Sequence, residues 1–270
     1  MSRLQQVFRI AEWGLGQLSL GARGKAYPIA ELDNLAWFAS KEKKLPTTTL
    51  DALFPGIRSL SFELMGAVPR LPGNLTPQEL CVAAMVCRRL RARRIFEFGT
   101  YNGRTTLNLA LNMPPDGQVF TLDLPQPGQT QFSTDRQDDK LQLGDASGGY
   151  YRQSPVSSRV QQLWSDSAVF DESPFAKSMD LVFVDASHTY EYVRNDTTKA
   201  LAMLREGGAI LWHDYCVWYP GVVRCLHELQ RHHKIWHIEG TLLAMMPPAT
   251  APGITGDDRS CDGSSESAVH

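Results

Sequence analysis

The sequence lacks the marks of several protein classes. Its 270 residues contain no apolar run of the roughly 18 residues that a membrane span requires, and Glu12 interrupts the first apolar stretch, so no signal-peptide pattern is present. The five cysteines are scattered and form no Cys-x-x-Cys pair, which argues against a zinc knuckle and against a disulfide framework. These absences predict a cytoplasmic protein with reduced thiols and no membrane span.

Neither sign of charge is in large excess. The chain has 27 Lys and Arg against 29 Asp and Glu, a formal net charge of -2, which gives no support to a nucleic-acid-binding surface. The basic cluster at residues 88–94 is local and is expected to be the solvated end of a helix. No Asn/Asp-Pro-Pro-Tyr motif for base binding is present. We therefore expect a small-molecule partner and no nucleic acid.

Three zones follow one another along the chain. Residues 1–75 are broken by Pro and Gly, and apolar residues at helical spacing near the start predict a helical or irregular extension that packs on the main domain or instead serves as a lid or as a contact in a homo-oligomer. Residues 76–246 alternate between strand-like and helix-like segments. Residues 247–270 are rich in Pro, Ala, Gly and Ser, which predicts a disordered tail.

The middle zone has the pattern of an α/β domain. The segment from Thr76 to Glu79 is a strong helix start, with Thr as the cap, Pro in the first position and Glu three residues after the cap. Strands are expected at 94–98, 118–123, 159–164, 180–184, 208–213, 234–238 and 241–246, and helices notably at 104–112, 190–204 and 220–232. This alternation predicts a doubly wound, mainly parallel seven-stranded sheet that ends in an antiparallel hairpin.

A glycine-containing turn follows the first strand of this zone. In residues 96–106 an apolar run ends in Glu97, Gly99 follows, and Gly103 comes four positions later, before a helical stretch. Such a strand–turn–helix unit brings bare backbone and free helical N–H groups close to a ligand. The spacing is neither Gly-x-Gly-x-x-Gly nor that of a P-loop, so the turn alone predicts a nucleotide-like cofactor without naming it.

Acidic residues end the next two strands. Asp123 stands where it can accept hydrogen bonds from both ribose hydroxyls of an adenosine, and Asp166 follows the third strand, where it can reach an adenine amino group.

Residues 125–157 interrupt the pattern and are rich in Gln, Asp, Gly and Ser. A loop of that length in a compact domain is usually functional or disordered.

Two further strands end in a pair of carboxylates. Asp185 follows the strand at 180–184, and Asp214 follows the strand at 208–213. If the strands are parallel neighbours, the two side chains emerge at the same edge, where open α/β sheets bind ligands. Two close carboxylates repel each other unless a proton or a cation lies between them, so the pair indicates a divalent cation with oxygen ligands.

These residues carry a family resemblance. Residues 97–103 resemble motif I of class I S-adenosylmethionine-dependent methyltransferases, whose Rossmann-like sheet also has seven strands and a terminal hairpin. The resemblance covers residues 76–246 and makes the expected cofactor S-adenosylmethionine. It assigns the following residues to the cofactor: Glu97, Gly99, Thr100, Tyr101, Gly103, Asp123 and Asp166.

The acid pair resembles that of metal-dependent O-methyltransferases of the catechol and caffeoyl-CoA type, and more closely that of bacterial macrocin-type sugar O-methyltransferases. This resemblance implies a cation, expected to be Mg2+, on Asp185 and Asp214, with His213 as a further ligand or a residue that orients Asp214. Tyr215 stands where the plant and animal enzymes have an Asn ligand. His188 replaces their Lys, and its pKa suits a base near neutral pH.

The sequence thus predicts methyl transfer to a hydroxyl of a sugar, polyketide or phenol, with His188, Asp185 and Asp214 in the catalytic machinery. Candidates for the acceptor pocket are Tyr150, Tyr151, Trp218 and Tyr219. Two alternatives stay open. One is a cofactor-binding or regulatory domain without turnover, which a pocket blocked by residues 125–157 would favour. The other is an NAD-dependent oxidoreductase, against which the glycine spacing and the lack of a tyrosine–lysine pair argue.

Overall fold

The computed structural model describes residues 45–66 and 73–251, which belong to a compact unit that begins at Leu45. The helical stripe expected near the start of the chain and most of the expected tail lie outside the described residues. Within the described ranges, no helix combines the length and the apolar character that crossing a bilayer requires.

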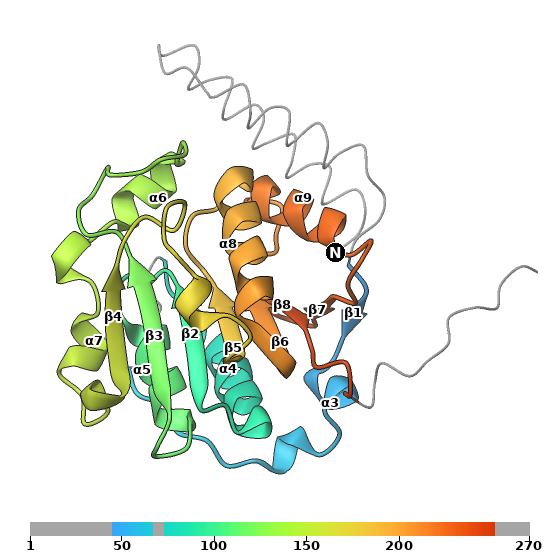
Figure 1. Ribbon diagram of the computed structural model, residues 1–270. Helices are drawn as coiled ribbons and strands as arrows, with labels where there is room; N and C mark the ends of the chain where they lie inside the picture. Colours follow the sequence, from blue (N-terminus) through green and yellow to red (C-terminus); the bar gives the residue numbers. More distant parts are fainter. Residues whose placement is uncertain (1–44, 67–72, 252–270) are drawn as a thin grey trace, which may run out of the picture. The chain divides into compact units, whose positions relative to one another are not determined.

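The described part of the chain forms an α/β unit around one sheet (Figure 1). Its strands are β1 (Thr47–Thr48), β2 (Arg94–Phe98), β3 (Gln118–Asp123), β4 (Val160–Trp164), β5 (Met179–Val184), β6 (Leu204–Trp212), β7 (Trp236–Ile238) and β8 (Ala244–Met246). Its α-helices are α3 (Leu50–Leu53), α4 (Pro77–Leu90), α5 (Arg104–Asn112), α6 (Arg136–Leu141), α7 (Gly149–Arg152), α8 (Tyr190–Met203) and α9 (Pro220–Leu229).

The strands lie in the order β1-β7-β8-β6-β5-β2-β3-β4. All neighbouring pairs are parallel except those of β8, which is antiparallel to both β6 and β7. The predicted parallel sheet with an antiparallel hairpin at its end is therefore confirmed. Because β2 to β6 are parallel, their carboxyl ends meet at one edge of the sheet.

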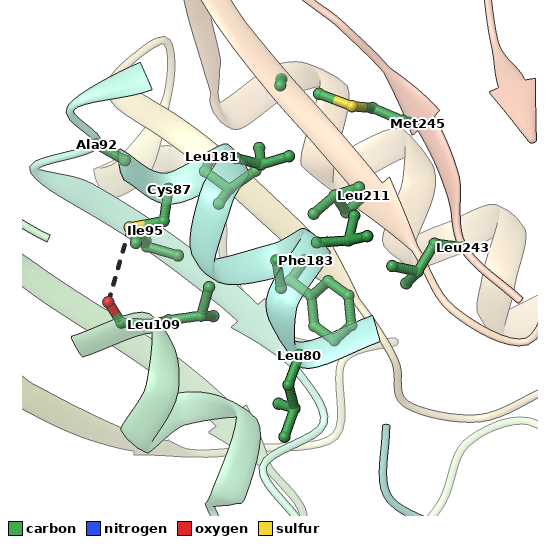
Figure 2. Packing of buried hydrophobic residues seen from close by; sticks show 14 of the residues in the cluster. Leu80, Cys87, Ala92, Ile95, Leu109, Leu181, Phe183, Leu211, Leu243 and Met245 are labelled. Carbon is green, nitrogen blue, oxygen red and sulfur yellow. Dashed lines mark hydrogen bonds between the residues drawn. The ribbon is translucent and has the colours of Figure 1, made fainter. Parts of the chain in front are cut away.

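Helices cover both faces of the sheet because its central strands are apolar on both sides. Alternate residues of β2, β3, β5 and β6 pack against α4 and α5 on one face and against α8 and α9 on the other. Figure 2 shows part of the first cluster, where Phe183 and Leu211 of the sheet lie near Leu80 of α4, and where Cys87 Sγ lies 3.7 Å from the carbonyl oxygen of Leu109. Two-sided burial is the normal state of a parallel sheet.

The start of α4 has the geometry that its sequence predicts. The Thr76 hydroxyl accepts a hydrogen bond from the Glu79 N–H, and the Glu79 carboxylate accepts one from the Thr76 N–H, so the capping box is complete. The predicted helices at 104–112, 190–204 and 220–232 correspond to α5, α8 and α9 within a few residues.

An eighth strand lies inside the segment that the sequence assigns to an N-terminal extension. β1 pairs parallel with β7, and the α3 residues Leu50 and Leu53, together with Ile57, are buried in the core. Residues 45–66 therefore belong to the same unit as the sheet, because they bury apolar side chains against it. The compact unit that contains the sheet begins at Leu45.

One face of α5 attaches the segment before α4. Arg104, Asn108 and Asn112 are spaced four residues apart, so they lie on one side of the helix. The amide of Asn108 exchanges two hydrogen bonds of 2.9 Å with the backbone of Met65, and the amide of Asn112 does the same with Glu63, at 2.9 and 2.7 Å. The two amides therefore hold residues 63–65, which belong to no strand, against α5.

Candidate functional site

The glycine turn after β2 is shaped by close contacts with its neighbours. Gly99 has φ +89°, and a Cβ at this position would lie 2.2 Å from the carbonyl oxygen of Asp185. Gly103 has φ +80°, and its Cβ would lie 2.7 Å from the Cα of Gly148. The left-handed backbone and the close approach both require glycine. The sequence assigns that close approach to a ligand, whereas in this structure the partner is the chain itself.

The side chains of Glu97 and Thr100 turn inward below this turn. The Glu97 carboxylate accepts hydrogen bonds from the hydroxyls of Thr106 and Thr121, and Thr100 shares a 2.7 Å hydrogen bond with Thr121. Burial raises the pKa of Glu97 to about 8, against the effect of the two hydroxyl donors. Both residues therefore support the turn from inside the domain.

Asp123, at the end of β3, accepts hydrogen bonds from three sides. Its donors are the backbone N–H of Tyr101 at 2.9 Å, the backbone N–H of Leu124 at 2.8 Å and the hydroxyl of Ser147 at 2.9 Å. Burial raises its pKa despite these donors. Tyr101 itself has φ +48°, an uncommon value for a residue with a side chain, and such values cluster at functional sites.

Asp166, after β4, is buried and accepts three hydrogen bonds. They come from the backbone N–H of Gln131 at 2.6 Å, the hydroxyl of Tyr192 at 2.9 Å and the backbone N–H of Ala168 at 2.9 Å. The segment 125–157, through Ser147 and Gln131, therefore contacts both acids that the sequence assigns to the cofactor.

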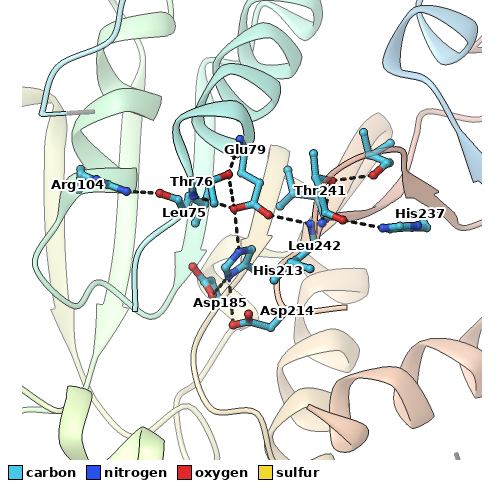
Figure 3. Close-up of polar contacts among 12 residues, drawn as sticks. Leu75, Thr76, Glu79, Arg104, Asp185, His213, Asp214, His237, Thr241 and Leu242 are labelled. Carbon is cyan, nitrogen blue, oxygen red and sulfur yellow. Dashed lines mark hydrogen bonds and ion pairs between the residues drawn. The ribbon is translucent and has the colours of Figure 1, made fainter. Parts of the chain in front are cut away.

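The second group of predicted residues meets at the ends of β5 and β6 (Figure 3). His213 Nδ1 lies 3.1 Å from Asp185 Oδ1 and 3.2 Å from Asp214 Oδ2. One ligand atom from each of these three residues lies within 4.8 Å of the other two, and His213 and Asp214 are buried. Asp214 has φ +59°, a left-handed value that a non-glycine residue adopts only under constraint. The structure thus brings together the three residues predicted to hold a cation.

His188 lies beside this group, between two carboxylates. Its Nε2 is 2.8 Å from Asp214 Oδ2, its Nδ1 contacts the carboxylate of Asp138 from α6, and its ring stacks on Tyr219 with centroids 4.0 Å apart. Both ring nitrogens therefore face acids, and the ring connects Asp138 with Asp214. The role of His188 as a base stays a prediction.

Opposite charges control the ionisation of this cluster. Burial disfavours the charged forms, but the carboxylates of Asp138 and Asp214 raise the pKa of His188, and those of Asp185 and Asp214 raise the pKa of His213, well above the usual histidine value. Burial likewise opposes ionisation of Asp214, yet the two histidines hold its pKa below the usual range. Burial raises the pKa of Asp185.

The comparison with known proteins connects both groups of residues. Residues 96–215 match the model of a family described as a methyltransferase domain, a span that runs from the strand before the glycine turn to the residue after Asp214. This match and the O-methyltransferases among the relatives support a place in the class I S-adenosylmethionine-dependent O-methyltransferase family. The resemblance inferred from residues 97–103 is thereby confirmed.

Individual relatives are distant. A putative O-methyltransferase of Mycolicibacterium vanbaalenii is 31% identical over 164 residues, which cover 60% of this chain and 62% of that protein. Caffeoyl-CoA O-methyltransferase of Populus kitakamiensis is 24% identical over 177 residues, 63% of this chain and 69% of that protein. Among solved structures, the O-methyltransferase TomG from Streptomyces achromogenes in complex with SAM is 19% identical, with a TM-score of 0.49 over 71% of this chain and 94% of that one.

The three residues at the ends of β5 and β6 are of the types that could hold a metal ion. Two carboxylates and one imidazole converge there, and desolvation raises the pKa of the half-buried Asp185 carboxyl. Tyr215, which stands in place of the Asn ligand of plant and animal enzymes, contributes no ligand atom. Its hydroxyl lies 2.8 Å from His227 Nε2 and accepts a hydrogen bond from the Leu45 N–H.

The predicted acceptor aromatics have different surroundings. Tyr151 is buried against Gly148 and donates a hydrogen bond to Gln162, so it has a structural role rather than a place in a pocket. Tyr219 stacks on His188 at the site, and Trp218 beside it is about half exposed. Of the four predicted acceptor aromatics, Tyr219 in the loop after β6 is the one that contacts a site residue.

Two residues of the site were missed by the sequence analysis. Glu79 and Asp138 each direct a carboxylate at a site histidine, Glu79 at His213 and Asp138 at His188. Glu79 was recognised only as part of a helix start, and Asp138 lies in a polar segment without periodicity. No local signal connects either residue with a histidine 50 or more positions away.

Proposed function

We propose that this methyltransferase transfers the methyl group of S-adenosylmethionine to a hydroxyl of a small molecule, a sugar, polyketide or phenol, with the help of a divalent cation. We expect it to act in the cytoplasm. The observation that carries the proposal is the arrangement of the two residue groups along one edge of the sheet.

This edge places the two groups on adjacent strands. Asp166, Asp123 and the glycine turn follow β4, β3 and β2, and Asp185 follows β5, which pairs directly with β2. The Asp185 N–H donates a 3.0 Å hydrogen bond to the Phe98 carbonyl, next to the turn. A transferase must hold the methyl donor and the acceptor side by side, and adjacent strand ends provide that proximity.

The cofactor residues would act by binding and orientation. The turn from Gly99 to Gly103 would lie against the cofactor just before α5, where the N–H groups of Gly99, Tyr101 and Gly103 are hydrogen-bonded within the chain, and Asp123 and Asp166 would bind the ribose and the adenine. When bound, S-adenosylmethionine supplies an activated methyl group on its sulfonium sulfur. For the cofactor to reach Asp123 and Asp166, the contacts of Ser147 and Gln131 must give way.

The second group would act on the acceptor. Asp185, His213 and Asp214 would hold the cation, for which the family resemblance indicates Mg2+, and a bound divalent cation lowers the pKa of a hydroxyl that it coordinates. His188, held by Asp138, would keep the Asp214 carboxylate in place through its 2.8 Å contact. The stacked Tyr219 forms a wall beside this contact.

A binding panel tests the proposal without a known acceptor. S-adenosylhomocysteine and NAD are each added with and without Mg2+ or Mn2+, and the shift in melting temperature is measured. We expect stabilisation by S-adenosylhomocysteine, an additional shift with a cation, and no effect of NAD. A larger shift with NAD would contradict the assignment and favour the oxidoreductase alternative, against which the family match argues.

A second candidate is a cofactor-binding domain without turnover. The contacts of residues 125–157 with Asp123 and Asp166 favour it, because they occupy the hydrogen-bonding positions of both acids. The same panel separates the two candidates. If S-adenosylhomocysteine fails to bind even at millimolar concentration, the segment closes the site and the transfer proposal is wrong.

A further inference from the structure

The cation site of this chain contains a nitrogen donor, His213, whose ring has carboxylates on both sides. Nδ1 faces Asp185 and Asp214 at 3.1 and 3.2 Å, and Nε2 lies 3.5 Å from Glu79 Oε2 on the opposite side of the ring (Figure 3). Within the described ranges, the buried Nε2 makes no hydrogen bond of normal geometry, so the Glu79 carboxylate is the acidic group placed to receive its proton.

Glu79 is itself fixed in place. Its Oε2 accepts hydrogen bonds from the Thr76 N–H at 2.7 Å and the Thr76 hydroxyl at 2.9 Å, and its Oε1 accepts one from the Leu242 N–H at 2.7 Å. The residue is 2% exposed, between the start of α4 and the turn from β7 to β8. Three donors from two separate elements leave the carboxylate no other rotamer without breaking hydrogen bonds in a buried place.

The Glu79 carboxylate determines which ring nitrogen of His213 can bind a cation. Metal-binding histidines commonly donate the second ring N–H to a carboxylate, which fixes the ring orientation and raises the basicity of the ligating nitrogen. With the Nε2 proton directed at Glu79, the lone pair of Nδ1 is directed at the space between Asp185 and Asp214. The imidazole of His213 would then bind the cation through Nδ1.

Nitrogen changes the preference among cations. Mg2+ is a hard ion that takes oxygen ligands and keeps several waters, whereas imidazole suits first-row transition ions. We infer that Glu79 is a positioning residue that presents His213 Nδ1 to the cation, and that the site therefore prefers a first-row transition cation, for which Mn2+ is the probe, over Mg2+. This inference rests on the proposed function, because it assumes that Asp185 and Asp214 hold a cation.

Calorimetric titration of the full chain with Mn2+ and with Mg2+, in the presence of S-adenosylhomocysteine, tests the inference. The variants are Glu79→Gln, which removes the charge facing His213, and His213→Asp, which makes the donor set all oxygen. Thr76→Ala is the matched control, because it removes the helix cap and one contact of Glu79 without touching His213. Circular dichroism and the melting temperature report folding of each variant.

We expect the wild type to bind Mn2+ more tightly than Mg2+, and the ratio of the two affinities to fall at least about tenfold in His213→Asp. Glu79→Gln should weaken Mn2+ binding by about 10- to 100-fold. Thr76→Ala should lower the melting temperature while Mn2+ affinity changes by less than about threefold.

Three results would overturn the inference. Equal affinity of the wild type for Mn2+ and Mg2+ removes the preference, and an Mn2+ affinity of Glu79→Gln within about threefold of the wild type removes the role of Glu79. These comparisons stand even if His213→Asp fails to fold. If the wild type binds S-adenosylhomocysteine but neither cation, the cation part of the proposed function fails and this inference fails with it.

Discussion

The buried carboxyl of Glu97 should make stability depend on pH in a way that one substitution removes. Glu97 lies on the central strand β2, is 1% exposed, and burial raises its pKa from the ordinary 4.5 to about 8. Between these values the folded protein holds a proton that the unfolded chain has lost. The free energy of unfolding therefore falls as the pH rises through this range.

The magnitude follows from the difference between the two values. Each pH unit is worth about 1.4 kcal/mol, so the range from 4.5 to about 8 sets a ceiling of about 5 kcal/mol. Glu97→Gln keeps the shape and the acceptor for the hydroxyls of Thr106 and Thr121 but does not titrate. Between pH 5.5 and 8 the wild type should therefore lose about 2–3 kcal/mol relative to this variant.

Urea denaturation at several pH values measures this difference directly, because effects of all other titrating groups cancel between the two proteins. Glu206→Gln, which removes an exposed carboxylate, is the control for loss of an acid in general. If the unfolding free energies of the wild type and Glu97→Gln run parallel from pH 5.5 to 8, Glu97 is ionised in the folded protein and the reasoning is refuted.

Three further substitutions test the geometry. Gly99→Ala should lower the free energy of unfolding, measured by urea denaturation, by at least about 2 kcal/mol, because the new Cβ would meet the Asp185 carbonyl oxygen. The control is Gly128→Ala, which has φ +78° but open space around it and should cost about 1 kcal/mol. Equal losses in the two variants would show that the contact with the oxygen has no effect. Asp138→Asn should weaken Mn2+ binding about tenfold in calorimetry through His188, and unchanged affinity would refute that link. Asn108→Ala removes three hydrogen bonds, two with Met65 and one to the Arg104 carbonyl, and should cost about 1–3 kcal/mol of unfolding free energy; a loss below about 0.3 kcal/mol would show that they contribute little.

The sheet was predictable because its strands are long apolar runs separated by helical periodicity and clear helix starts. The capping box at Thr76 and the hairpin after Trp236 are local signals that do not depend on the rest of the fold. β1, in contrast, has only two residues, and its place beside β7 depends on packing of the following apolar residues. A segment that short carries no periodicity from which to predict it.

The site was predictable to the extent that strand order fixes it. Asp185 and Asp214 follow strands that pair, so their meeting at one edge follows from the alternation pattern alone. Glu79 and Asp138 approach the histidines from helices α4 and α6, and such contacts depend on tertiary packing. The base role expected for His188 was derived from its residue type, whereas the carboxylates on both sides of the ring decide what it can do.

The most direct test of the whole account is paired calorimetry on Asp185→Asn and Asp214→Asn, with S-adenosylhomocysteine and then Mn2+ as ligands. The account places the methyl donor on β2 to β4 and the cation on β5 and β6. It therefore predicts that both variants bind S-adenosylhomocysteine within about threefold of the wild type, and that both lose Mn2+ affinity by at least about 100-fold. Loss of S-adenosylhomocysteine binding with intact folding, or unchanged binding of Mn2+, would contradict it.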